Sequence, residues 1–207
     1  MACNLTRGYA VDCKDSIGGL KYVYFCDDFS SNIRACATFN GTDALQMDTA
    51  GFANWDAYGT TTGSKMTVFR YDLRPGASNM NVTINSSAEN GTTFYGQALS
   101  LTLPKLSVKE THEIKLICQN RVQIFIEDQN GNMFLIGMDN GVEVSGGTVV
   151  SGAARGDMSG YTLEFLAEEK DPMIWIKPDT GTDTTPEGPF DGLSDAASLD
   201  VVVGTGA

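Results

Sequence analysis

The chain has 207 residues, 42% of them hydrophobic, which is enough for one large domain or for a domain with an ordered appendage. Its 26 acidic and 14 basic residues give a formal net charge of −12, so we expect it to repel nucleic acid phosphates. The sequence contains no apolar run of about 18 residues, so no transmembrane helix is predicted. The first residues, MACNLTRGYAVDCKDS, lack the apolar core of a signal peptide.

The first part of the chain is predicted to contain short strands separated by turns. Gly51–Tyr58 is either a strand or a loop packed by Phe52 and Trp55. In KMTVFRYDL, apolar residues occupy both odd and even positions, and therefore both faces of a strand, which predicts a strand covered on both sides. The predicted strands are Leu20–Phe25, Asn32–Phe39, Asp43–Asp48 and Lys65–Leu73.

The middle of the chain, from Met66 to Trp175, has the pattern of a β-ribbon, a helix and a second ribbon. The first ribbon is Asn79–Leu103, with a turn at Asn90-Gly91 and with Met80, Val82 and Ile84 on one face. The second is Arg121–Met138, with a turn at Asn130-Gly131. Asn-Gly between alternating runs predicts a type I′ turn, in which both central residues have positive φ. The first ribbon is long enough to protrude from a compact body.

The single predicted helix covers Val108–Gln119. Ser107 and Glu110 form a capping-box pattern at its start. Ile114, Ile117 and Cys118 make one apolar stripe, which predicts the buried face. The sole histidine, His112, has no Cys or Asp cluster near it and is interpreted as a surface or half-buried residue rather than as a metal ligand or a base.

Further strands are predicted at Ser159–Ala167 and Pro172–Lys177, with Asn140-Gly141 and Gly146-Gly147 marking turns before them. From Pro178 the composition changes to Pro, Gly, Thr, Asp and Ser, which indicates a boundary between a domain at 1–177 and an extension at 178–207.

The extension carries six acidic residues and no Lys or Arg. It is either a solvated tail or an acidic surface that lines a channel or docks on a basic partner. Leu199–Val203 is β-branched enough to add an edge strand, and we expect it to contact an adjacent subunit or ring.

No residues with the pattern of a catalytic, cofactor-binding or metal site are found, so the chain is not predicted to be an enzyme and no cofactor is implied. Asp27-Asp28 and Glu168-Glu169 are adjacent carboxylates that point to opposite faces of a strand. DQNGN at 128–132 lacks the Glu at the twelfth position of a calcium loop and is interpreted as a turn.

The sequence has an odd number of cysteines, five, and no C-x-x-C motif, so neither a zinc site nor a redox dithiol is predicted. Free thiols are expected instead, with Cys26 and Cys118 as small core residues. The cysteines are Cys3, Cys13, Cys26, Cys36 and Cys118.

Two stretches of the chain carry a family resemblance. ACNLTRGYAVDCKDSIGGLKYVYF is similar to the opening of virion structural proteins from tailed phages and prophages of Bacteroidetes hosts. VQIFIEDQNGNMFLIGMDNGVEVSGGTVVSGAARGDMSGYTLEFLAEEKDP resembles their C-terminal half. The resemblance covers roughly residues 2–176, and the extension from Pro178 departs from it.

The predicted fold is mainly β, a β-sandwich or barrel with one short α-helix and a long protruding hairpin, which resembles the tail-tube fold. The resemblance implies a homo-oligomeric ring, a hexamer or dodecamer, that contacts adjacent virion tail or neck proteins. DNA would pass through it without specific binding, and no membrane would be involved. Such a protein is synthesised in the host cytoplasm and located in the virion.

A major tail tube subunit and a ring protein of the head–tail junction remain open alternatives. One rival function is a capsid decoration or head-fibre-anchoring protein, which would form trimers or sit singly on hexons. Another is a carbohydrate-binding adhesin module, in which Trp55 and Tyr58 stack on sugars. The absence of a signal peptide pattern argues against the adhesin.

Overall fold

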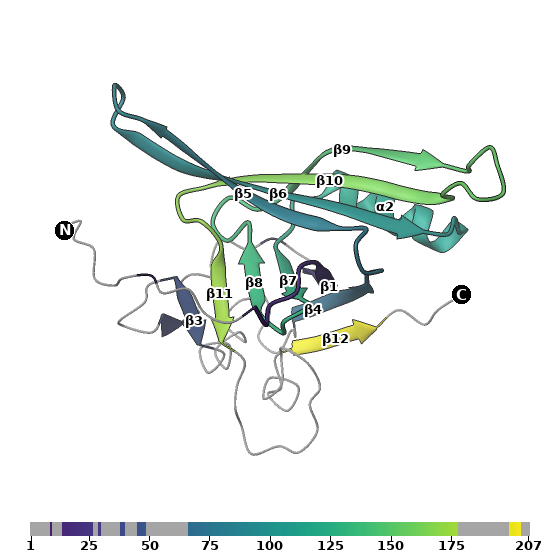
Figure 1. Ribbon diagram of the computed structural model, residues 1–207, viewed down its shortest axis with the longest axis horizontal. Coiled ribbons are helices and arrows are strands. Elements are labelled where there is room, and N and C mark those ends of the chain that lie inside the picture. The colour runs from purple at the N-terminus through teal and green to yellow at the C-terminus, as the bar shows by residue number, and fades with distance from the viewer. Residues whose placement is uncertain are drawn as a thin grey trace, which may run out of the picture.

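The computed structural model describes residues 9, 14–26, 29, 38–39, 45–48, 66–177 and 199–203. Within them the chain forms two β-sheets that face one another as an open sandwich, with one helix, α2 (Val108–Gln119) (Figure 1). The predicted mainly-β sandwich with one short helix is therefore confirmed. The alternative of a barrel is not, because neither sheet closes.

The first sheet has an antiparallel centre in the order β4-β1-β7-β8-β11. At its two edges, β12 pairs in parallel with β4, and β3 pairs in parallel with β11 and antiparallel with β2. The strands of this sheet are β1 (Leu20–Cys26), β2 (Thr38–Phe39), β3 (Gln46–Asp48), β4 (Met66–Asp72), β7 (Ile124–Asp128), β8 (Met133–Ile136), β11 (Ile174–Lys177) and β12 (Leu199–Val203).

The second sheet is antiparallel throughout, in the order β5-β6-β10-β9. Its strands are β5 (Asn79–Ser87), β6 (Thr92–Pro104), β9 (Glu143–Val150) and β10 (Gly160–Glu169). The core lies between the two sheets because alternate side chains of each strand point inward. Leu99 and Phe165 of the second sheet belong to this core with Phe25 of β1, and the Phe25 and Phe165 rings are 5.5 Å apart.

The strands of the first sheet are buried on both faces near its centre. Ile124 and Ile126 point into the core, yet Gln123, Phe125 and Glu127 on the opposite parity are buried as well. The negative charge of the buried Glu127 carboxylate is balanced by Lys21, whose Nζ lies 2.9 Å from Oε1. The Tyr24 hydroxyl donates a hydrogen bond to Oε2 over 3.4 Å. The alternation of apolar and polar residues in the sequence therefore predicts the strand correctly, but the face that carries Gln123, Phe125 and Glu127 is not exposed to solvent.

Both predicted hairpins form, but their turns are not of type I′. Residues 88–91 connect β5 to β6, and residues 129–132 connect β7 to β8. Gly91 has φ +62° and Gly131 has φ +79°, whereas neither Asn90 nor Asn130 has positive φ. In each of these four-residue connections only the glycine adopts a left-handed conformation, which glycine does without steric cost.

The Asp128 carboxylate holds the second of these turns through hydrogen bonds. Its carboxylate accepts hydrogen bonds from the backbone N–H of Asn130 at 2.8 Å and of Asn132 at 2.7 Å. The Nδ2 of Asn132 donates to it as well, over 2.8 Å. Burial raises the pKa of this carboxyl, but the hydrogen bonds from Asn132 and Asn130 outweigh it, so the net pKa is lowered.

Asp128→Asn is expected to make stability less dependent on acid pH. A carboxyl whose pKa is lowered by folding stabilises the folded state above its ordinary pKa of 3.8, and this contribution is lost as the pH falls below that value. The free energy of unfolding of the wild type should therefore exceed that of the variant at neutral pH and approach it below about pH 3.8. Urea denaturation over a pH series measures this. A constant difference at all pH values would contradict it.

The helix begins and ends where the sequence predicts, at Val108 and Gln119. Ser107 Oγ accepts a hydrogen bond from the Glu110 N–H at 3.2 Å, but the reciprocal bond of a capping box is not formed. The predicted stripe is only partly correct, because Ile114 is buried and Ile117 half-buried, while Cys118 is exposed. Cys26, in contrast, is buried as expected.

Ser107→Ala is expected to lower the free energy of unfolding by about 1 kcal/mol, because it removes the acceptor for the Glu110 N–H at the helix start. Ser107→Asp, which keeps an acceptor, should retain most of that stability. Thermal or chemical denaturation of both variants checks this. Equal losses in the two variants would show that the stability does not come from an acceptor for the Glu110 N–H.

Two further sequence predictions need correction or refinement. Gly146-Gly147 does not mark a turn but lies inside β9, where an added Cβ at Gly147 would be 2.7 Å from the Thr162 carbonyl oxygen. The predicted edge strand Leu199–Val203 is present as β12, but it pairs with β4 of its own chain, whereas a neighbouring subunit was expected. Most of Asn32–Phe39 and all of Gly51–Tyr58 lie outside the described residues.

Candidate assembly surface

In the part of the chain that the structure describes, the second sheet ends in two strands without a partner on their outer side. Among the described residues, β5 pairs only with β6, and β9 pairs only with β10. All three ladders in the sheet are antiparallel, so β5 and β9 run in opposite directions. They are similar in length, with 9 and 8 residues. Each therefore presents backbone N–H and C=O groups to which another strand could bind.

The solvent-facing side of this sheet carries negative charge only. Residues directly opposite one another in a ladder share a face, so Glu164 lies on the same face as Ser100, and Glu143 on the same face as Leu166. Glu143, Glu164 and Glu168 are exposed there, and β5, β6, β9 and β10 contain no Lys or Arg. This face is consequently a poor surface for nucleic acid phosphates.

The β5–β6 hairpin extends beyond the rest of the sheet (Figure 1). Strand β10 ends at Glu169, opposite Tyr95, so residues 85–94 have no support from a third strand. From residue 79 to residue 104 the only charged side chain is Glu89, at the turn. Ile84 is 67% exposed and Phe94 39% exposed on this arm. A long ribbon with exposed apolar side chains and a single charge suits contact with protein surface.

Two buried polar side chains fix this sheet against the first one. Gln97 Nε2 donates to the carbonyls of Asp171 and Pro172, and its Oε1 accepts from the Gly137 N–H at 2.9 Å. Glu169 Oε1 accepts from the backbone N–H of Asn140 at 2.8 Å and of Asp139 at 3.1 Å. These bonds join the end of β10 and the middle of β6 to the turns that lead into β9 and β11.

Burial raises the pKa of the Glu169 carboxyl, although the N–H groups of Asn140 and Asp139 act in the opposite direction. Glu168 beside it is exposed, so this pair points to opposite faces as expected. The other adjacent pair, Asp27-Asp28, lies outside the described residues, and so do Trp55 and Tyr58.

The described residues contain no group of three or more His, Cys, Asp and Glu side chains placed to hold a metal ion. His112 is exposed on α2, which is one of the two predicted placements, surface or half-buried. In the described part of the chain, no helix is both long enough and apolar enough to cross a membrane.

Comparison with known proteins gives no family model, curated protein or solved structure that matches this chain.

Proposed function

We propose that this protein is a structural subunit of a tailed-phage tail tube or neck that assembles with copies of itself into a ring around a DNA-conducting channel. The observation that supports this proposal is the second sheet, whose two edge strands, β5 and β9, have no outer partner among the described residues and run in opposite directions.

Opposite edge directions matter because of how a ring is built. A rotation about an axis roughly along the strands keeps every strand direction unchanged. The β5 strand of one copy would therefore lie antiparallel to the β9 strand of the next copy, which is the arrangement already present inside the sheet. Such a contact joins two different surfaces, and repeated contacts of this kind close into a ring when the rotation divides a full turn evenly.

Ring closure would turn the four-stranded sheets into one continuous barrel with the carboxylate face toward the channel. Because Glu143, Glu164 and Glu168 are the charged side chains that the four strands present on that face, and these strands contain no Lys or Arg, DNA would meet repulsion from the wall. Low affinity is what a conduit requires, since each Lys or Arg bound to a phosphate would slow passage.

Negative-stain imaging and native mass measurement of the purified full-length protein test this proposal. Annular particles with a central hole, and a mass equal to a whole-number multiple of the 22.1 kDa subunit, are expected. Compact trimers would favour the capsid decoration rival. A monomer over the whole accessible concentration range would contradict self-assembly.

A further inference from the structure

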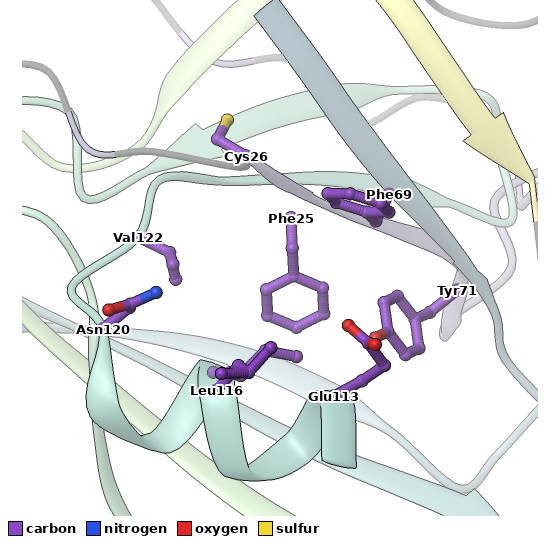
Figure 2. A pocket seen from close by; sticks show the side chains of 9 residues that line it. Phe25, Cys26, Phe69, Tyr71, Glu113, Leu116, Asn120 and Val122 are labelled. Atoms are coloured by element: carbon purple, nitrogen blue, oxygen red, sulfur yellow. The ribbon is translucent and has the colours of Figure 1, made fainter. Parts of the chain in front are cut away.

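A cavity of about 250 Å³ lies between α2 and strands β1 and β4 of the first sheet. Figure 2 shows its two sides: β1 and β4 supply aromatic rings, and α2 supplies the opposing side chains. The residues that line it include Phe25, Phe69, Tyr71, Glu113, Leu116 and Asn120. Its volume is below the roughly 300 Å³ at which pockets for drug-sized ligands begin, so it suits a ligand the size of one side chain.

Three aromatic side chains form the wall that β1 and β4 supply. The Phe25 and Tyr71 rings are 5.1 Å apart and inclined by 80°, so the edge of one ring meets the face of the other. Phe69 lies two residues before Tyr71 on β4, so it is on the same face of the strand and lines the same cavity. The faces of aromatic rings carry partial negative charge and attract cations within about 6 Å of the ring centre.

Charges around the cavity are negative as well. Its lining includes the carboxylate of Glu113, beside the Tyr71 ring in Figure 2, and no Lys or Arg. Glu110 precedes Glu113 on α2, and its Oε2 is buried without a hydrogen-bond partner. Lys109, one helical turn before Glu113, forms no ion pair with it. A cation in the cavity would meet unneutralised carboxylate charge.

The ionisation of Tyr71 is consistent with that field. Burial, followed by the charges of Glu113 and Glu110, raises the pKa of Tyr71 to about 12. Its hydroxyl therefore stays protonated at neutral pH and adds no charge of its own, and it remains able to donate or accept a hydrogen bond at the cavity wall.

We propose that this cavity binds an alkylammonium group, with the alkyl chain against Phe25, Phe69 and Leu116 and the cationic nitrogen near Glu113 and the Tyr71 ring. A neutral alkyl ligand would gain only the apolar contacts, and an anion would be repelled. The proposal is independent of ring assembly, because every group it uses lies within one chain.

Titration of ¹⁵N-labelled full-length protein with n-butylammonium, followed by NMR, tests this directly. Saturable shifts are expected for the amides of Phe25, Tyr71 and Asn120. n-Butanol, which has the same number of heavy atoms without the charge, should bind about tenfold more weakly. Equal binding of the two compounds, or no saturable shift with the amine, would overturn the proposal.

Two variants separate the charge contribution from general effects. Glu113→Gln should weaken n-butylammonium binding about fivefold or more and leave n-butanol unchanged. Glu164→Gln, on the exposed face of the second sheet, should change neither. Because both side chains are exposed, both variants should fold, and circular dichroism confirms this. An unchanged amine affinity in Glu113→Gln would also overturn the proposal.

The same chemistry can come from a free amine or from a lysine of a partner protein. N-acetyl-lysine N-methylamide carries the lysine side chain on a capped backbone and distinguishes these sources. Binding of this compound as tightly as n-butylammonium supports a protein lysine. Binding of n-butylammonium alone supports a small free amine, since the capped backbone then does not fit at the mouth of the cavity.

Discussion

Phe165→Ala is expected to lower the free energy of unfolding by about 3–5 kcal/mol. Phe165 is 1% exposed, lies opposite Leu99 in the β6–β10 ladder and packs against the Phe25 ring of the first sheet. Truncation removes an aromatic side chain from the contact between the two sheets and leaves a cavity that neighbours on rigid strands cannot fill. Chemical denaturation measures the loss.

The neighbouring residue provides a matched control. Leu166 lies in the same strand and the same ladders, but its side chain points away from the core and is 42% exposed. Leu166→Ala should change the free energy of unfolding by no more than about 0.5 kcal/mol. If Leu166→Ala lowers the free energy of unfolding as much as Phe165→Ala does, the face of the second sheet that carries Phe165 is not the one that packs against the core.

This pair also shows why so much of the second sheet could be predicted from the sequence. Tyr161, Leu163 and Phe165 alternate with polar or exposed residues, and a period of two along a strand leaves only one choice of inward face. The helix could be predicted equally well from the sequence, because Ser107 and Glu110 mark its start independently of any tertiary contact. Local patterns decide these elements, and the structure agrees with them.

Other features depend on long-range contacts that leave no local pattern. Cys118 continues the apolar stripe of α2 in the sequence, yet the helix turns that position to solvent because the core meets it through Ile114. Gly146-Gly147 looks like a turn, but it lies inside β9, where the Thr162 carbonyl approaches Gly147 too closely for a side chain. Asn-Gly located both hairpins while the connection length decided their geometry.

The candidate surfaces were predictable to different degrees. The protruding ribbon follows from its length in the sequence, and the lack of Lys and Arg in its strands can be read directly. The two edge strands of the second sheet, which lack an outer partner among the described residues, could not be predicted, since strand order places β10 between β6 and β9 only after folding. The cavity beside α2 joins residues 25, 71 and 113, which no sequence motif connects.

Shortening the β5–β6 hairpin is expected to abolish assembly without unfolding the subunit. Ile84 lies directly opposite Tyr95, so replacing residues 85–94 by Asn-Gly closes the ribbon with a two-residue turn at that pair. The ladder between β6 and β10 begins at Tyr95 and stays intact, and so does the core. The variant loses the arm that reaches beyond the sheet, together with the exposed Phe94.

Light scattering and thermal denaturation should then give separate answers. The mass should fall from that of the oligomer to that of the monomer, or the concentration needed for assembly should rise at least about tenfold, which corresponds to about 1.4 kcal/mol of lost contact energy. The melting temperature of the monomer should stay within a few degrees. Glu89→Ala, which keeps the arm and removes only its single charge, serves as the control and should still assemble. An oligomer of unchanged stability in the shortened variant would show that subunits meet through the sheet edges alone, since the arm is then dispensable.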